Sequence, residues 1–324
     1  MSATTHTPRT AGANSPLRST AAVRALLEGP AITPADLSMV LLVTEDDQAS
    51  RPMPTVTVAG IPAVVRDCAR LGIRSVKIFA ESTQRDDTGS VSLAPDSLMA
   101  RAVHAAKDAE PDIAVMTETC LCSYTTGGLC YLTGPGGRPD LSATIEVTAR
   151  QAVAHAEAGA DIIGPASMVL GTTRGARDAL DQAGYDARSV MPHVIYHSTL
   201  YDGFRLTMGA TPNAGADRAF QINPGNGDQF LDSALRLVTD GADMLLLEPA
   251  LFTADMLRDL KARTLVPLFP FSVSGEYTTL APVDPATGNR DIRTLTELCT
   301  TLRRAGAAAT VTYGAVEIAR RLNS

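Results

Sequence analysis

The stretch Ala158-Gly159-Ala160-Asp161-Ile162-Ile163-Gly164-Pro165 contains the pattern that decides the fold. A helical segment ends there at a glycine, and a short, continuously apolar run follows at once. Glycine suits the left-handed position that closes a helix, and an apolar run without alternation is typical of a strand buried on both faces. The stretch therefore predicts a helix that leads directly into a strand of a parallel sheet.

The same pattern recurs along the chain. The segments Asp240-Gly241-Ala242-Asp243, Ala305-Gly306-Ala307 and Leu71-Gly72 each end a helical stretch and lead into an apolar run. Strand-like runs occur at residues 39–43, 75–79, 113–116, 162–165, 190–196, 244–247, 268–273 and 309–313. Helical stretches separate most of them, for example at residues 61–71, 143–158, 229–238 and 295–304. Strands that alternate with helices in this way predict an α/β protein, a (β/α)8 TIM barrel.

The beginning of the chain differs from the rest. Residues 1–17 are rich in Ser, Thr, Pro and Ala and have no apolar period, which predicts a mobile arm. A short helix is expected at residues 18–27, ended by Gly29-Pro30. We therefore predict an extended N-terminal arm at residues 1–36 and a catalytic barrel domain at residues 37–324.

Composition limits the function classes. A chain of 324 residues with 45% hydrophobic content can bury the core of one large domain. A formal charge of −7 argues against nucleic acid or an anionic membrane as a partner. No apolar run approaches the roughly 18 residues of a membrane span, and no signal-like segment begins the chain, so we expect a cytoplasmic protein.

Three of the five cysteines, Cys120, Cys122 and Cys130, lie within eleven residues that follow a predicted strand. Gly127 and Gly128 allow this loop to fold back and bring the third thiol to the first two. Three thiolates with an open fourth position suit a zinc ion that still binds water or substrate. Two other interpretations remain open, namely three unrelated cysteines or a closed site with a distant fourth ligand. Cysteine clusters in a reducing compartment favour a metal over disulfides.

Polar residues follow the predicted strands, where a TIM barrel carries its chemistry. These residues are Glu81, Glu118, Ser167, His197, Glu248, Ser274 and Tyr313.

Several linked motifs resemble the porphobilinogen synthase (δ-aminolevulinate dehydratase) family. They are the cysteine loop, Val273-Ser274-Gly275-Glu276-Tyr277, Thr312-Tyr313, Gly159-Ala160-Asp161-Ile162-Ile163 with Pro165 and Met168, Phe204-Arg205, Arg218 with Gln221 and Pro224, and Gly241-Ala242-Asp243-Met244. The resemblance runs from about residue 15 to the C-terminus. It implies a barrel whose N-terminal arms wrap neighbouring subunits in a homo-oligomer, typically an octamer. It also implies a catalytic zinc on the three cysteines, and two lysines that hold two δ-aminolevulinates as Schiff bases while a pyrrole forms.

The chain departs from this family at both lysines. Glu248-Pro249 stands where the second lysine is expected, and the first position falls among Ile195, Tyr196, His197 and Thr199. The three lysines of the chain are Lys77, Lys107 and Lys261. A Schiff base requires a primary amine, so the family's chemistry cannot run here through its usual residues.

The resemblance also implies two grips for substrate carboxylates. Ser274 and Tyr313 match the residues that bind the carboxylate of one substrate, and Arg205, Arg218 and Gln221 match those that hold the other. Guanidinium groups suit this task because they bind a carboxylate through two parallel hydrogen bonds.

Four residues are candidates for a catalytic role, and three of them have an alternative structural interpretation. Glu118 replaces an acidic residue of the family beside the cysteine loop. Lys77 is a relocated amine if its face of the strand points into the barrel, or else a paired or surface lysine. Glu248 is a general base with a pKa raised by burial, a ligand or an ammonium partner, or else a member of an ion pair with a nearby arginine. His197 is an acid, base or ligand, or a structural residue at a strand end.

We therefore predict a diverged, zinc-dependent enzyme that catalyses a lyase-type condensation or dehydration of small carboxylate-bearing amino or keto acids without a lysine Schiff base, in a specialised biosynthetic pathway. One alternative is a true porphobilinogen synthase that uses another amine, such as Lys77. Another is a non-catalytic binding or assembly protein. The retained carboxylate grips count against that last interpretation, and fold similarity alone does not fix the reaction.

Overall fold

The main sheet of the chain consists of parallel strands that close into a barrel. The computed structural model describes residues 16–46, 50–212 and 219–324, and the sheet within them contains nine strands. In chain order these are β1 (Leu37–Val43), β2 (Ser75–Ala80), β3 (Ala114–Thr119), β6 (Ile162–Pro165), β7 (Ser189–Val190), β8 (His193–Ile195), β9 (Leu245–Glu248), β10 (Leu268–Ser272) and β11 (Thr310–Thr312). Their order in the sheet is β7-β6-β3-β2-β1-β11-β10-β9-β8.

The two strands at the ends of this order belong to one continuous run of the chain. β7 pairs with β6, β8 pairs with β9, and only Met191 and Pro192 separate β7 from β8. Proline has no N–H to donate to a strand ladder, which accounts for the interruption. Met191 N donates to Ile163 O (2.7 Å), and Leu246 N donates to Pro192 O (3.0 Å). The interrupted run therefore closes the ring, and the predicted (β/α)8 barrel is confirmed.

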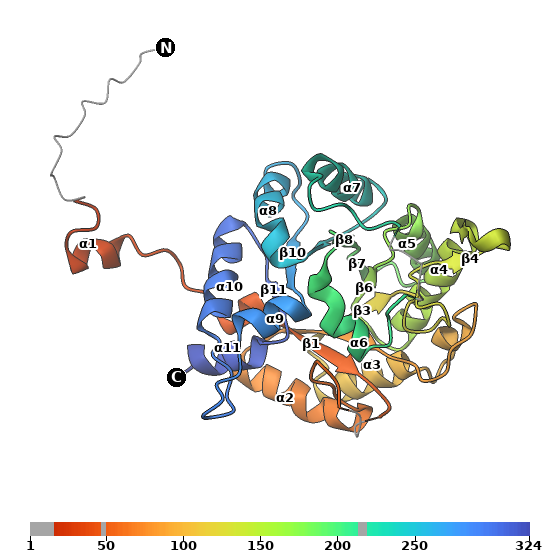
Figure 1. Ribbon diagram of the computed structural model, residues 1–324, viewed down its shortest axis with the longest axis horizontal. Helices are drawn as coiled ribbons and strands as arrows, with labels where there is room; N and C mark the ends of the chain where they lie inside the picture. The colour runs from red at the N-terminus through yellow and green to blue at the C-terminus, as the bar shows by residue number, and fades with distance from the viewer. Residues whose placement is uncertain (1–15, 47–49, 213–218) are drawn as a thin grey trace, which may run out of the picture. The chain divides into compact units, whose positions relative to one another are not determined.

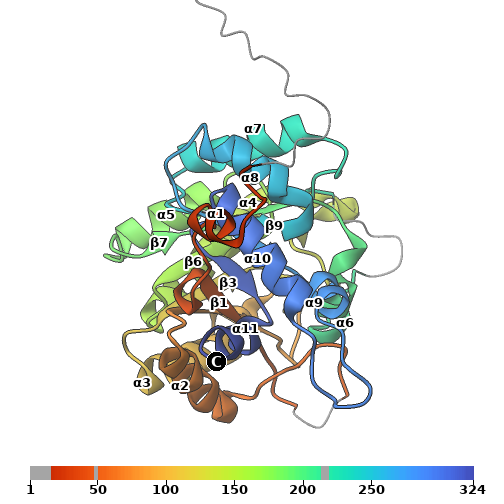
Figure 2. The same ribbon diagram turned by 90° about the vertical axis from the view of Figure 1, so that its left-hand side faces the viewer.

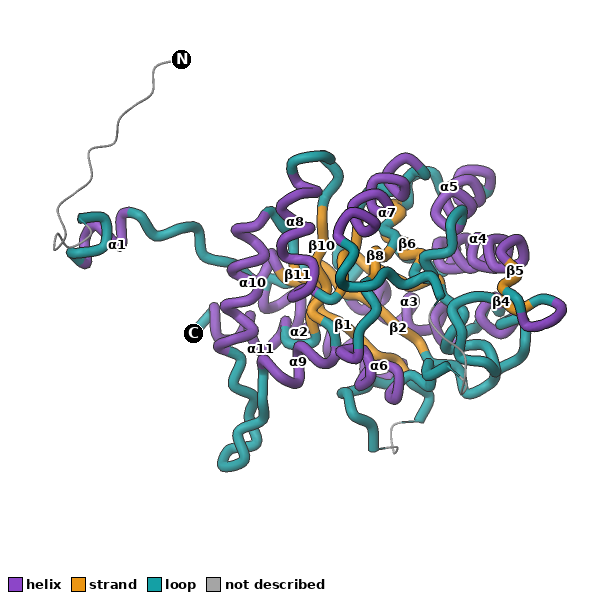
Figure 3. Tube along the Cα trace, turned by 45° about the horizontal axis from the view of Figure 1, so that its top comes forward, coloured by secondary structure: helices purple, strands orange, loops and turns teal. Residues whose placement is uncertain are grey.

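Helices surround the strands, as Figure 1 and Figure 3 show. They are α2 (Ile61–Leu71), α3 (Leu98–Ala109), α4 (Leu141–Glu157), α5 (Thr172–Gln182), α7 (Gly227–Thr239), α8 (Ala254–Lys261), α10 (Arg293–Ala305) and α11 (Ala315–Leu322). α10 buries Leu295, Leu298, Cys299 and Leu302, whose spacing places them on one face of the helix. Gly72, which ends α2 with φ 89°, adopts the left-handed conformation that the sequence pattern predicts.

Two shorter helices lie beside the strand ends. α6 (Asp202–Thr207) follows the run that contains β8, and α9 (Ser274–Leu280) follows β10. The two helices pack on each other and lie side by side in Figure 2. A small antiparallel pair, β4 (Leu132–Thr133) and β5 (Pro139–Asp140), follows the cysteine loop.

The chain divides into two units, Met1–Ile32 and Thr33–Ser324. The first contains α1 (Ala21–Leu26), the short helix expected at residues 18–27. The expected mobile segment at residues 1–17 lies almost entirely outside the described residues, so the arm at residues 1–36 stays a prediction. Among the described helices, none is both long and apolar enough to span a membrane.

Candidate active site

A pocket of about 510 Å³ opens at the carboxyl ends of the barrel strands. Its polar lining combines the cysteine loop with side chains from several strands and from α6, namely Glu118, Cys120, Cys122, Cys130, His193, Tyr201, Arg205, Gln221, Glu248 and Tyr313. Its apolar lining is Phe79, Ala166, Ile195, Phe204, Phe271 and Val273. The residues come from distant parts of the sequence, and the closing of the barrel brings their strand ends together.

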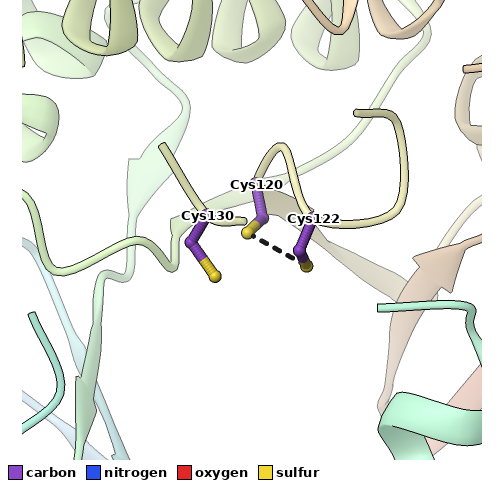
Figure 4. Close-up of side chains that lie close together, drawn as sticks. All are labelled: Cys120, Cys122 and Cys130. Carbon is purple, nitrogen blue, oxygen red and sulfur yellow. Dashed lines mark hydrogen bonds between the residues drawn. The ribbon is translucent and has the colours of Figure 1, made fainter. Parts of the chain in front are cut away.

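The three thiols of the cysteine loop form a cluster at one side of this pocket. The sulfurs of Cys120 and Cys122 are 3.4 Å apart, and all three Sγ atoms lie within 4.8 Å of one another. Figure 4 shows them on the folded-back loop, as the sequence predicted. The interpretation of three unrelated cysteines is therefore wrong.

This donor set fits a metal ion. Zinc–sulfur bonds of about 2.3 Å in a tetrahedral site place the sulfurs about 3.8 Å apart, which matches the spacing of the cluster. Hydrogen bonds to Cys122 and Cys130, followed by burial, raise the pKa of the Cys120 thiol well above its usual range. A cation held by the sulfurs would offset this effect, because it stabilises the thiolate. Within the described part of the chain, no fourth histidine, cysteine or carboxylate joins the group, which favours an open site over a closed one.

Three of the five predicted carboxylate-binding residues line or approach the pocket. Arg205 lines it and pairs with Asp202 (3.0 Å) at the start of α6. Tyr313 is 2% exposed, and neither its hydroxyl nor Gln221 Oε1 has a hydrogen-bond partner within the described residues. Buried polar atoms normally have partners, so these two atoms are suited to bind the polar groups of a ligand.

Two of the predicted site residues do not line the pocket, and a third lies outside the described residues. Ser274 does not line the pocket, because its hydroxyl donates to Leu200 O (2.9 Å) and accepts from Phe204 N (3.1 Å). The side chain of His197 is exposed and is not part of the pocket lining. The position of Arg218 lies outside the described residues.

The two predicted acids both reach the pocket. Glu118 lies near the end of β3 and is half-buried. Glu248 ends β9, is 4% exposed, and lies at the level of Ile195 on the neighbouring strand. Burial raises the pKa of the Glu248 carboxyl to about 8, and the nearby charge of Glu118 adds to the rise. Glu248 therefore faces the barrel interior, and its partner there is His193 rather than an arginine.

His193 connects Glu248 to Lys77. Its Nδ1 lies 2.8 Å from Glu248 Oε1, and its Nε2 lies 3.0 Å from Lys77 Nζ. Lys77 is completely buried, and its ammonium also donates to Thr117 O (2.7 Å). Burial lowers the pKa of Lys77 to about 8.

Lys77 points into the barrel, so its interpretation as a surface lysine is wrong. It does not line the pocket itself, but it contacts Phe79 and His193, which do. Neither Lys107 nor Lys261 lines the pocket either. The pocket lining therefore contains no primary amine from the described part of the chain.

Sequence reasoning missed His193, because it lies within the apolar run at residues 190–196. The available signal was the alternation along a strand, which places residues 193 and 195 on the same face. Its two partners come from β2 and β9, and no local pattern indicates those contacts.

The fold and site define a barrel protein with a three-thiol cluster and acidic groups at the strand ends. The sequence profile described as "Delta-aminolevulinic acid dehydratase" matches residues 13–321. The delta-aminolevulinic acid dehydratase of Bacillus subtilis (strain 168) is 31% identical, over 94% of this chain and 96% of the relative. The one from Escherichia coli (strain K12) is 33% identical, over 94% of this chain and 96% of the relative.

A solved structure agrees with these relatives. The delta-aminolevulinic acid dehydratase of Toxoplasma gondii ME49, crystallised with its reaction product porphobilinogen, superposes with a TM-score of 0.89. It is 27% identical, and the match covers 95% of this chain and 91% of that one. The chain belongs to the delta-aminolevulinic acid dehydratase (porphobilinogen synthase) family, which consists of lyase-type enzymes.

Proposed function

We propose that this chain is a metal-dependent lyase that condenses or dehydrates small carboxylate-bearing amino or keto acids without an imine on a lysine of its pocket. The observation that carries the proposal is the pocket lining, which combines a thiol cluster, Arg205 and two acids, with no primary amine among the residues that the structure describes. An imine requires such an amine. The reaction proposed here belongs to the family's class and differs in how the substrate is held.

Residues of the chain supply the binding and the proton transfer. Arg205 offers a planar pair of donors for a carboxylate, and Tyr313 and Gln221 offer polar groups toward a substrate. Glu248 is suited to move a proton, because a carboxyl that titrates near neutral pH can both take up and release one.

The cysteine cluster supports zinc as the metal. Thiolates suit zinc among the common metals, and a three-ligand site leaves a coordination position for substrate. A zinc ion bound there would act as a Lewis acid toward an oxygen or nitrogen of the substrate. We propose that Cys120, Cys122 and Cys130 hold it.

A second candidate function is porphobilinogen formation from δ-aminolevulinate, as in a true porphobilinogen synthase. The relatives that carry the dehydratase name match nearly the whole chain, and this favours δ-aminolevulinate as the substrate. In this alternative another amine, such as Lys77, forms the Schiff base, and the complete burial of Lys77 beside His193 counts against that role.

One experiment separates the two candidates. Zinc-loaded protein is incubated with δ-aminolevulinate, treated with sodium borohydride, and analysed by mass spectrometry together with the products. Borohydride reduces an imine to a stable amine, so an adduct on Lys77 would establish the second candidate. Conversion without any lysine adduct is the result expected from our proposal.

The metal is tested on the same protein. We expect about one zinc per chain by elemental analysis, and a large loss of zinc in Cys122→Ala, because three thiolate ligands bind zinc far better than two. Cys299→Ala is the matched control, since Cys299 is buried in α10 away from the pocket. Protein that stays metal-free in zinc-containing buffer would refute the metal site.

A further inference from the structure

Three ionisable side chains form a continuous chain inside the barrel. Lys77 on β2, His193 on β8 and Glu248 on β9 are 0%, 2% and 4% exposed. The distance from Lys77 Nζ to His193 Nε2 is 3.0 Å, and that from His193 Nδ1 to Glu248 Oε1 is 2.8 Å. His193 and Glu248 line the pocket, whereas Lys77 lies behind them. This row of three side chains thus has one end at the pocket and one end in the closed interior.

A glycine on β6, two strands away from β2 in the sheet, leaves room for the ammonium. A Cβ atom at Gly164 would lie 2.6 Å from Lys77 Nζ and 2.7 Å from Thr117 O. Any other residue at position 164 would therefore displace the ammonium from Thr117 O and His193. The absence of a side chain on this part of β6 leaves room for Lys77 to reach the imidazole.

The donor pattern fixes the tautomer of His193. An ammonium has donors and no acceptor, so Nε2 of His193 must accept from Lys77. The ring proton is then on Nδ1, which donates to Oε1 of Glu248. The pattern can also reverse. A neutral Lys77 amine accepts from Nε2–H, and Nδ1 then accepts from the protonated carboxyl of Glu248.

We propose that Lys77, His193 and Glu248 form a proton relay in which Glu248 exchanges protons with the substrate and Lys77 is the internal proton reservoir. When Glu248 has given its proton to the substrate, the Nδ1 proton of His193 moves to the carboxylate. A proton of the Lys77 ammonium moves to Nε2 at the same time. Glu248 is again a neutral acid, Lys77 is a neutral amine, and His193 has changed only its tautomer. The relay therefore allows two successive proton donations without water in the barrel, and it runs in reverse for proton uptake.

The charges around the relay allow this exchange. Glu248 faces Glu118 on β3, Glu276 on α9 and Arg205 on α6. Glu248 and Glu118 also lie near Tyr313, while Lys77 faces His155 on α4 across Thr117. Burial raises the pKa of Glu248 to about 8 and lowers the pKa of Lys77 to about 8. Because the two groups titrate in the same range, a proton moves between them with little free-energy difference.

Burial also keeps His193 neutral, as a relay requires. Burial, followed by the charge of Lys77, lowers the pKa of the His193 imidazole well below its usual range. A neutral ring has one proton to pass on and one lone pair to receive another. A permanently charged ring would block both steps.

The first test of the relay needs no substrate. In the zinc-loaded, full-length protein labelled with ¹⁵N-histidine, the His193 ring is expected to carry one proton, on Nδ1, at pH 6. The signal is assigned by its absence in His193→Gln. In Lys77→Met the Nε2 resonance is expected to move toward that of a free acceptor, whereas Lys261→Met leaves it unchanged. A doubly protonated ring, or a proton on Nε2 at pH 6, would overturn the relay.

The second test uses turnover and rests on the proposed function, with δ-aminolevulinate as the probe. His193→Gln retains a donor and an acceptor but cannot exchange them between its two ends, so kcat is expected to fall about 100-fold or more with little change in KM. Lys77→Met is expected to lower kcat and to raise the pH midpoint of activity, because the ammonium holds down the pKa of Glu248. Lys261→Met is the control for both.

The outcomes separate the two ideas. Wild-type kcat and pH profile in His193→Gln would show that the histidine is only structural, and the relay would be refuted. No conversion of δ-aminolevulinate by the wild-type protein would count against that substrate, while the tautomer of His193 would still decide the relay.

Discussion

Glu248 is the residue on which the chemistry of the pocket depends. Its carboxyl is 4% exposed and forms a hydrogen bond with the neutral ring of His193. A buried carboxyl without a salt bridge favours its protonated form, because a low-dielectric environment disfavours the charge. Glu248 therefore lines the pocket together with the thiol cluster, and its ionisation above neutral pH destabilises the folded protein.

The cost of ionising Glu248 predicts that the free energy of unfolding depends on pH. The pKa of Glu248 is raised from 4.5 to about 8, so the folded protein binds a proton between these values that the unfolded chain does not. Stability from this group is present at low pH and is lost as the pH rises through the window. The glutamine of Glu248→Gln cannot ionise, so it avoids this loss. The free energy of unfolding of the variant minus that of the wild type should therefore increase between pH 5 and pH 8, by an amount on the order of a few kcal/mol.

Urea denaturation at several pH values measures this difference. Glu276 and the buried histidines are present in both proteins, so their contributions largely cancel. Glu297→Gln, at an exposed position of α10, is the matched control. A constant difference for Glu248→Gln between pH 5 and pH 8 would show that the carboxyl titrates normally.

At the scale of elements, a buried carboxylate joins two strand ends beside the pocket. Glu276 on α9 accepts from Val273 N (2.6 Å) after β10, and from Leu251 N (2.6 Å) and Ala250 N (3.3 Å) in the short helix after β9. These N–H groups favour the ionised form, but burial outweighs them and raises the pKa of Glu276 to about 7. Glu276 thereby fixes the loops that carry Glu248 and Val273 relative to each other.

Replacing this carboxylate should weaken both loops. Glu276→Gln retains one acceptor oxygen and loses the charge-assisted hydrogen bonds, so we expect a loss of about 1–3 kcal/mol at pH 8. Hydrogen exchange at the amides of Leu251 and Val273 should become faster, while exchange in α2 changes much less. Unchanged exchange at these two amides would mean that the carboxylate does not hold the loops.

At the scale of the whole molecule, the barrel is completed by a run of chain that proline interrupts. β7 and β8 contribute two and three residues to the two neighbouring ladders, and together they close the ring. The active-site groups of this run, His193 and Ile195, lie on the far side of Pro192. The interruption thus separates the part that only closes the sheet from the part that contributes to the pocket.

The N-terminal unit leads to a prediction about assembly. Family resemblance implies that the arm contacts neighbouring subunits, so light scattering after gel filtration should give a multiple of the 33.9 kDa chain mass. A variant that lacks residues 1–32 should form smaller assemblies, because the barrel unit begins at Thr33. A full-length protein of 33.9 kDa in solution would contradict this expectation.

Local patterns in the sequence predicted the architecture well. Apolar runs located the barrel strands, and the glycines after α2, α4, α7 and α10 located the turns that lead into four of them. The cysteine loop indicated the thiol cluster, because its ligands are close in sequence and its glycines allow a tight return. These features depend on residues that are near one another in the chain.

Contacts between distant strands were decided only by the tertiary structure. The sequence left the orientation of Lys77 open, assigned a role to the exposed His197, and passed over His193. It also assigned a substrate contact to Ser274, whose hydroxyl binds the backbone instead. A strand pattern states which residues share a face, but the closing of the barrel determines which faces meet. Lys77, His193 and Glu248 are in contact because β2, β8 and β9 surround the same interior. No local sequence pattern predicts that contact.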